Sequence, residues 1–303
     1  MATPDLSQRL VDAIRSAYGT HPGHRAAHAK GTCCEGSFTA TPDASRLSRA
    51  AVFNGDPTPV TARFSNGSGD PARPDTALDG RGLAVKFHLP NGEELDFVGL
   101  SQPVFFVRDL ESFIEFSERR NDRSAVEAWI GQHPEALPAV MHLMTTPAAA
   151  SYTDIPYHGI HAFRLRDAAG AGRWARYRWV PLNPSRPLSS EERKARSERY
   201  LQEELEQRFA GGGPGEASFR LEYQLAAPDD PIDDPTAAWP EEREVLTAGT
   251  LKLTKLAGDQ AAGCEKLVFD PMHLIDGIEP SDDPILHARP GAYSISIEER
   301  LAR

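Results

Sequence analysis

The stretch Phe219-Arg-Leu-Glu-Tyr-Gln-Leu225 decides the fold class, because apolar and polar residues alternate along it without interruption. Alternation with a period of two residues is typical of a β-strand that has one buried and one solvated face. The stretch Leu251-Lys-Leu-Thr-Lys-Leu256 continues the pattern. These two stretches predict antiparallel strands in this part of the chain.

Short apolar or alternating runs also occupy the region before these stretches, and clusters of Gly, Pro, Asn and Asp separate them. Runs bounded by such turn residues are typical of successive β-strands. The further predicted strands are 62–64, 83–87, 95–98, 104–107, 159–165 and 174–180.

Helices are predicted by their start residues and by apolar spacing. Thr3-Pro4-Asp5 has the residues of a helix start, and apolar residues recur near helical period from Leu6 to Tyr18. Asp109 is expected to cap a second helix, and residues 135–144 form a third.

A long charged helix is predicted over about 190–210, because Gly211-Gly-Gly-Pro-Gly215 can end it. It lies between predicted strands, and no repeat or low-complexity linker divides the chain. The pattern therefore predicts one α+β domain over residues 1–303, in which antiparallel strands form a closed barrel with surrounding helices.

Composition and charge exclude several classes of protein. The 303 residues include 33 basic and 44 acidic side chains, so the net charge is −11. An acidic chain of this kind argues against nucleic acid or an anionic membrane as a partner. No apolar run approaches the ~20 residues of a membrane span, and the N-terminus lacks the features of a secretory signal.

The cysteines are Cys33, Cys34 and Cys264. An odd number, with two of them adjacent, argues against a disulfide framework, so a reduced, cytoplasmic compartment is expected. No C-x-x-C pair occurs, which argues against a zinc finger.

His21, His24 and His28 are spaced by three and four residues and precede Cys33-Cys34, which raises the hypothesis of a transition-metal site. Pro22-Gly23 interrupts the helix that would place the histidines on one face, so surface or core-lining roles are favoured. The chain also lacks a G-x-S-x-G elbow, a Walker loop and a G-x-G-x-x-G turn after a strand.

A set of strings in fixed order stands out from the rest of the chain. They are RAAHAKG (25–31), RFS (63–65), DGRGLAVKF (79–87), DFVG (96–99), PVFFVRD (103–109), GIHAF (159–163) and DPILHARPGAY (283–293). In residue type, order and spacing the set resembles the haem-dependent catalase family, from about His24 to Arg300. The resemblance implies a catalase-like barrel that binds haem b, which is iron protoporphyrin IX.

The resemblance implies roles on the distal side of the haem. His28 matches the histidine that moves a proton between the two peroxide oxygens, which is general acid–base work. Ser65 matches the serine that is hydrogen-bonded to this histidine. Ala27, Leu100 and Phe105 are assigned to the distal pocket.

On the proximal side, Tyr293 matches the tyrosine that binds the iron. Arg289, four residues earlier, matches the cation that donates to this oxygen. His161 and Asp283 match the pair that braces the arginine.

The resemblance also implies contacts with the rest of the haem. Arg25, Arg63 and Arg300 match the arginines that pair with its propionates, and solvated surface positions are the alternative. Phe113 matches the ring that stacks on the haem, and an ordinary core position is the alternative.

Two features depart from the family's pattern. Leu100 stands where the family has a distal asparagine, so a hydrogen-bond partner for peroxide is missing there. The chain also ends ten residues after Tyr293, as in the small catalase-related peroxidase branch. Full catalase activity and NADPH binding are therefore not expected.

These features predict a haem peroxidase that reduces hydrogen peroxide or an organic hydroperoxide with a small organic reductant, with weak catalase activity. One alternative is a haem hydroperoxide isomerase or dehydratase similar to allene oxide synthase. A non-catalytic haem-binding or sensor protein is the other. Neither nucleic acid nor a membrane is expected as a partner, and assembly into a homo-oligomer is left open.

Overall fold

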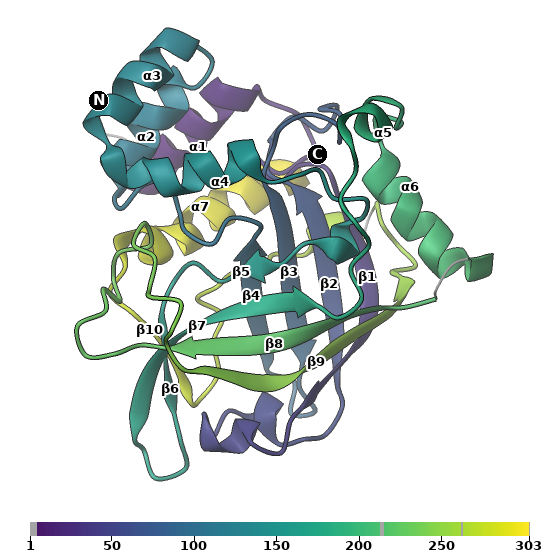
Figure 1. Ribbon diagram of the computed structural model, residues 1–303, viewed down its shortest axis with the longest axis vertical. Coiled ribbons are helices and arrows are strands. Elements are labelled where there is room, and N and C mark those ends of the chain that lie inside the picture. Colours follow the sequence, from purple (N-terminus) through teal and green to yellow (C-terminus); the bar gives the residue numbers. More distant parts are fainter. Residues whose placement is uncertain (1–4, 213–214, 262, 303) are drawn as a thin grey trace.

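The computed structural model describes residues 5–212, 215–261 and 263–302, and a closed antiparallel barrel lies at its centre (Figure 1). Eight strands follow one another around the barrel in the order β7-β5-β4-β3-β2-β1-β9-β8, and pairing of β7 with β8 closes it. β6 and β10 extend the sheet beyond β7. The described residues thus confirm the predicted α+β fold with a closed barrel. The strands are β1 (Gly31–Ala40), β2 (Thr58–Asn66), β3 (Arg81–His88), β4 (Glu94–Leu100), β5 (Tyr157–His158), β6 (Phe163–Arg166), β7 (Gly172–Pro181), β8 (Ala217–Leu225), β9 (Val245–Leu256) and β10 (Ile278–Pro280).

The barrel interior is filled by a packed hydrophobic core. Along β8, Phe219, Leu221 and Tyr223 are buried at every second position, as the alternating sequence predicts. Aromatic rings from other strands, such as Phe38 and Trp179, meet edge-on inside the barrel. Burial of these apolar surfaces supplies most of the stabilisation of the fold.

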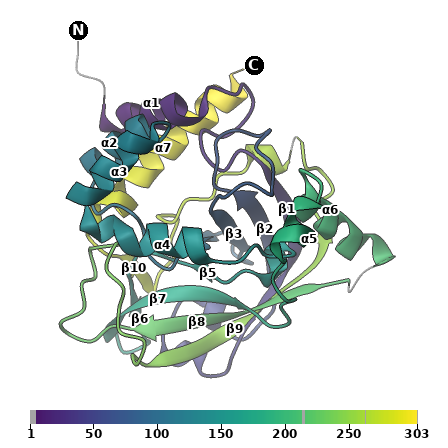
Figure 2. The same ribbon diagram turned by 45° about the horizontal axis from the view of Figure 1, so that its top comes forward.

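Helices gather over one end of the barrel (Figure 2). α1 packs against both α2 and α7. The helices are α1 (Leu6–Tyr18), α2 (Leu110–Arg119), α3 (Arg123–Gln132), α4 (Leu137–Thr145), α5 (Ser190–Lys194), α6 (Tyr200–Gln207) and α7 (Pro284–Leu301). Single 3₁₀ turns lie at Ala44–Arg46, Ala51–Phe53, Pro134–Ala136, Tyr152–Asp154 and Cys264–Lys266, and a wider turn follows α6 at Arg208–Gly212.

Most predicted elements are confirmed. The runs 62–64, 83–87, 95–98 and 174–180 fall inside β2, β3, β4 and β7, and residues 135–144 fall in a 3₁₀ turn and α4. Asp109 caps α2, because its carboxylate accepts the backbone N–H of Ser112. Asp5 precedes α1, whereas Thr3 and Pro4 lie outside the described residues. The predicted strand 159–165 is only partly correct, because β5 ends before Gly159 and β6 starts at Phe163.

The predicted strand 104–107 is wrong. These residues form a loop in which Val104 and Val107 are buried, so their apolar character reflects packing. The backbone N–H of Phe105 donates to the carbonyl of Pro235, which lies in another loop.

The predicted helix over 190–210 is only partly correct, because the range contains two helices, α5 and α6, with a break between them. The carbonyl of Glu198 accepts the N–H of Asp75 and the Nζ of Lys30. The N–H of Leu201 donates to the Asp75 carboxylate. These tertiary bonds take the place of helical ones, and local spacing does not reveal them.

The cysteine count misled the prediction, because Cys33 and Cys264 form a disulfide across 231 residues of chain. Cys33 and Cys34 are neighbours on β1, so their side chains point to opposite faces of the sheet. Cys34 is the free thiol and packs in the barrel core. Cys33 points to the other face, where the turn that carries Cys264 crosses β1.

The described residues contain neither a cluster of metal-ligating side chains nor a membrane-spanning helix. No group of three or more His, Cys, Asp or Glu side chains in the described ranges could hold a metal ion. His21 instead bonds to the carbonyl of Tyr18. None of the helices described is long and apolar enough to cross a membrane.

Candidate active site

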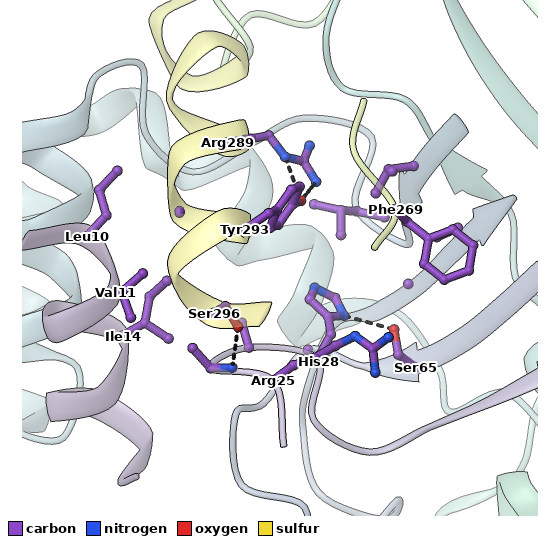
Figure 3. Close-up of a pocket in the computed structure, with 18 of the residues that line it drawn as sticks. Leu10, Val11, Ile14, Arg25, His28, Ser65, Phe269, Arg289, Tyr293 and Ser296 are labelled. Atoms are coloured by element: carbon purple, nitrogen blue, oxygen red, sulfur yellow. Dashed lines mark hydrogen bonds between the residues drawn. The ribbon is translucent and has the colours of Figure 1, made fainter. Parts of the chain in front are cut away.

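A cavity of about 330 Å³ lies between the helices and the end of the barrel (Figure 3). Its wall comes from α1, α2 and α7, from the ends of β2, β3 and β4, and from the loop that contains Leu267 and Phe269. Most of the wall is apolar. The polar groups that face it take up the smaller part of the wall.

One face of the cavity is set by strand register. Ser65 on β2 pairs with Gly82 on β3, and Gly82 pairs with Leu100 on β4. The three residues therefore lie side by side at the same end of the barrel. His28, just before β1, lies over this row, and its Nδ1 is 2.9 Å from Ser65 Oγ (Figure 3).

Gly82 leaves the room that the His28–Ser65 pair occupies. A Cβ at this position would lie 2.8 Å from Ser65 Oγ and 3.0 Å from His28 Nδ1. The first distance is shorter than real Cβ contacts and the second is tighter than most of them, so a larger residue would push the pair apart.

The backbone of His28 is in the left-handed region, with φ at 56°, and it is the one non-glycine residue there among those described. Hydrogen bonds on both sides hold the His28 backbone in this conformation. Its N–H donates to the carbonyl of Gly67, and its carbonyl accepts from the side chain of Arg63. Residues in this region are fixed by their surroundings and cluster at functional sites.

Burial lowers the pKa of His28 to about 3, and the cation of Arg63 adds to the effect. A buried imidazole beside cations avoids a further positive charge. His28 is therefore neutral at every ordinary pH. One of its nitrogens is held by Ser65, which leaves Nε2 for the cavity.

The opposite side of the cavity holds a continuous hydrogen-bonded chain. Asp283 lies 2.6 Å from His161 Nδ1, and His161 Nε2 is 3.1 Å from Arg289. Arg289 places its Nε and a second nitrogen 2.9 and 2.5 Å from the oxygen of Tyr293. Burial lowers the pKa of His161 to about 4, and Asp283 opposes that effect. The chain thus delivers two N–H donors to one phenol oxygen (Figure 3).

Local structure explains how α7 carries this chain. Asp283 is fully buried and caps the helix by accepting the N–H of Ile285 and Leu286. Arg289 and Tyr293 are four residues apart, so they lie on the same face of α7. His161 comes from the loop between β5 and β6 and is also buried.

Arg25, Arg63 and Arg300 lie together at another part of the cavity wall. Burial lowers the pKa of each guanidinium, while the carboxylate of Glu265 opposes the shift in all three. Glu265 forms ion pairs with Arg25 and Arg63. Glu265 carries no signal in the sequence pattern, because more than 200 residues separate it from both partners.

The other predicted pocket residues also line the cavity, namely Ala27, Leu100, Phe105 and Phe113. The rings of Phe105 and Phe113 are nearly parallel, with an angle of 12° between them. Ser101 is held elsewhere: its Oγ accepts the N–H of Arg81 and donates to Gln102. Leu100 is therefore the residue of this turn that faces the cavity.

All the residues to which the family resemblance assigns a role thus line one cavity or belong to the hydrogen-bonded chain that ends at Tyr293. His28 and Ser65 lie on one side, and Tyr293 lies on the other. Gly82 belongs to the string DGRGLAVKF, but only the strand register shows that it lies beside Ser65 and leaves room for the His28–Ser65 pair.

The similarity to known proteins covers the part of the chain that carries these residues. A profile of the catalase family matches residues 10–303. A catalase-related peroxidase of Mycolicibacterium paratuberculosis is 39% identical, over 98% of this chain and 95% of its own length. A catalase-related peroxidase of Synechococcus elongatus is 36% identical, over 98% and 88%.

Solved structures agree with the sequence relatives. A fungal catalase has a TM-score of 0.83 at 26% identity, covering 92% of this chain and 60% of that one. Catalase A from Saccharomyces cerevisiae has the same TM-score at 25% identity, covering 92% and 61%. This chain thus spans about three fifths of the length of these catalases. By fold, sequence and the residues around its cavity, the chain belongs to the catalase family.

Proposed function

We propose that this chain is a haem peroxidase, which reduces hydrogen peroxide or an organic hydroperoxide with electrons from a small organic donor. The chain is an oxidoreductase that acts on peroxide, as the family match and the relatives named catalase-related peroxidase indicate. One observation carries the detailed proposal. The His28–Ser65 pair and the Tyr293–Arg289 pair face one apolar cavity from two sides.

The cavity wall fits haem b. A large apolar surface suits the porphyrin faces, and the arginine cluster suits its two carboxylates. Arg63 Nε and Arg300 Nε are buried without a hydrogen-bond partner. Buried donors normally have partners, so these nitrogens support an anionic ligand here.

Tyr293 is the proposed iron ligand. Two N–H groups of the Arg289 cation meet its oxygen, an arrangement that stabilises a phenolate. Tyrosine is a known haem ligand, and hydrogen bonds behind a ligand tune its basicity. Arg289 itself is held by His161 and Asp283, so the oxygen has a fixed position.

The haem iron, when bound, supplies the electron transfer that reduces peroxide. His28 supplies the proton movement. With Nδ1–H donating to Ser65, Nε2 takes the proton from one peroxide oxygen and returns it to the other. Its low pKa keeps it in the neutral form that accepts a proton. Such positioned acid–base work contributes about 10²–10⁴-fold to a rate.

Leu100 supports peroxidase over catalase activity. It faces the cavity beside Gly82 and offers no hydrogen bond, so a second peroxide has no polar side chain from this position to orient it. We therefore propose weak oxygen evolution beside clear oxidation of organic donors. Isomerase and sensor functions gain no specific support, and a sensor does not need the His28–Ser65 pair.

Three further expectations remain proposals. The whole chain, 1–303, is proposed as one domain. A homo-oligomer is left open. A cytoplasmic location is proposed as well. The odd number of cysteines no longer supports it, because Cys33 and Cys264 form a disulfide and disulfides are rare in that compartment.

An absorption spectrum of protein purified from haem-sufficient cells tests the cofactor. A Soret band of the high-spin tyrosinate type is expected, and its absence would overturn the proposal. Peroxide-dependent oxidation of a dye then separates an enzyme from a sensor. Comparison of hydrogen peroxide with a fatty-acid hydroperoxide, with product analysis, separates a peroxidase from an isomerase.

A further inference from the structure

Residues 264–267 contact all three arginines of the cavity wall, and we call them the backing segment. The segment follows β9 and begins in the 3₁₀ turn Cys264–Lys266. The carboxylate of Glu265 pairs with Arg25 and Arg63. The backbone carbonyls of Cys264 and Leu267 accept hydrogen bonds from Arg25. The carbonyl of Leu267 also accepts one from Arg300, at 3.4 Å.

The carboxylate of Glu265 lies behind the arginines. Arg25, Arg63 and Arg300 line the cavity, whereas Glu265 is not part of its wall. One oxygen of Glu265 meets Arg25, and the other is 3.2 Å from Arg63. A ligand that enters the cavity thus meets the guanidinium groups first, with the carboxylate on their far side.

The charges of the cluster match a ligand with two carboxylates. The guanidinium groups carry three positive charges, and Glu265 compensates one of them. Among the residues described, no other carboxylate forms an ion pair with these arginines. Two positive charges remain on the cavity side, and uncompensated buried charges are costly.

The backing segment is itself tightly held. Cys264 is bonded to Cys33 on β1. Gln260, just before the segment, donates to the carbonyl of Cys33 at 2.7 Å and accepts its N–H at 2.8 Å. The backbone of the backing segment is therefore anchored to β1 by contacts other than those of the arginines.

We propose that Glu265 is a positioning residue that holds the side chains of Arg25 and Arg63 from the side away from the cavity. It also compensates one of the three positive charges of the cluster, so that two remain for the two carboxylates of the cofactor. The inference rests on the proposed function, since it takes haem as the ligand. Glu265 stays in place when the ligand binds and touches none of its atoms. It acts through the arginines, because its two carboxylate oxygens hold the guanidinium groups of Arg25 and Arg63 in place, and a neutral or shorter side chain loosens that hold.

The test compares haemin with haemin dimethyl ester, which has the same ring and iron but no carboxylate charge. Protein produced without haem is titrated with each, and the affinity is read from the Soret band. The measured quantity is the ratio of the two affinities, which isolates the carboxylate contribution. Glu265→Gln should lower this ratio at least about tenfold. Glu265→Asp keeps the negative charge but moves it away from the arginines, because the side chain is shorter by one methylene group. This variant should lower the ratio about threefold.

A matched control is Glu244→Gln, which breaks an exposed ion pair with Arg173 far from the cavity and should leave the ratio unchanged. An unchanged ratio in both Glu265 variants overturns the inference. A higher ratio also overturns it, because Glu265 would then compete with the cofactor for the arginines. If Glu265→Gln does not fold, as a circular dichroism melt will show, the Asp variant decides alone.

Failure of the proposed function gives a different result. In that case the unaltered protein takes up neither haemin nor its ester. Uptake of both with an unchanged ratio in the Glu265 variants contradicts only the role of Glu265.

Discussion

The two sides of the cavity differ in how their polar groups are held. On the side of Tyr293, four residues form an unbroken chain from a buried carboxylate to a phenol oxygen. On the side of His28, one hydrogen bond to Ser65 fixes the ring. The first arrangement suits a group that must keep its charge in one place. The second suits a group that must exchange a proton.

The difference also lies in what each side uses for support. The proximal chain depends on side chains from α7 and the loop after β5. The distal pair depends on backbone geometry, namely the left-handed φ of His28 and the missing side chain at Gly82. Substitutions should therefore affect the proximal side through loss of the cofactor and the distal side through loss of rate.

The most far-reaching effect is expected from Tyr293→Phe, because loss of the proposed iron ligand affects the cofactor itself. The variant should purify with on the order of tenfold less haem, or with a spectrum that is no longer of the tyrosinate type. Haem content per protein, measured by pyridine haemochrome, checks this. Tyr200→Phe is the control, because Tyr200 donates to the carbonyl of Ala149 outside the cavity. Unchanged haem content and spectrum in Tyr293→Phe would show that another residue binds the iron.

His28→Ala should keep its haem and lose at least about a hundredfold in peroxidase rate, because the proton carrier is gone. Stopped-flow mixing with peroxide measures the rate, and His88→Ala, outside the cavity, should behave like the unaltered protein. A variant that keeps more than about a tenth of the rate would point to a different proton carrier.

The pH profile sharpens the same comparison. An ordinary histidine base is lost by protonation as the pH falls through about 6.5. The pKa of His28 is lowered to about 3, so its neutral form persists above that value and is lost only as the pH falls through it. The rate of peroxide consumption should therefore show no titration near pH 6.5. A fall centred there that His28→Ala abolishes would contradict the low pKa.

Gly82→Ala should lower the peroxidase rate about tenfold, because the added methyl would meet Ser65 and His28. The haem spectrum should stay unchanged, since the proximal chain is not touched. Gly131→Ala is the matched control, because a Cβ there meets nothing within 4 Å. If Gly82→Ala shows full activity, the spacing of the distal pair is not critical.

The smallest effect is expected from Leu100→Asn. The new amide can orient a second peroxide, so oxygen evolution should rise a few-fold, while donor oxidation stays within a few-fold. An oxygen electrode and a dye assay measure the two reactions, and Leu100→Ala removes bulk without adding an amide. Oxygen evolution by the unaltered protein at the rate of a full-length catalase would show that position 100 needs no polar group.

Local pattern predicted the barrel well, since β2, β3, β4, β7, β8 and β9 carry the expected runs. The family resemblance brought Arg289 and Tyr293 together, and the structure places them four residues apart on one helix. His161 and Asp283 are 122 residues apart, and only the ordered strings of the family suggested their contact.

The failures share a physical cause. The break between α5 and α6 depends on hydrogen bonds to Asp75 and Lys30, which lie far away in the sequence. Glu265 has the same character, because its partners lie before β1 and on β2. Contacts of this kind leave no periodic trace in the sequence.

The Cys33–Cys264 bond also has a consequence for the unfolded chain. It closes a loop of 231 residues, so that most of the barrel lies between its two ends. A cross-link over a loop of this length restricts the denatured chain and can raise the free energy of unfolding by about 5 kcal/mol in the chain-entropy view. The oxidised chain would reach the unfolded state as a closed ring, with fewer conformations to gain than the open chain. Reduction would open that ring and make unfolding more favourable, even where every native contact of the barrel stays the same.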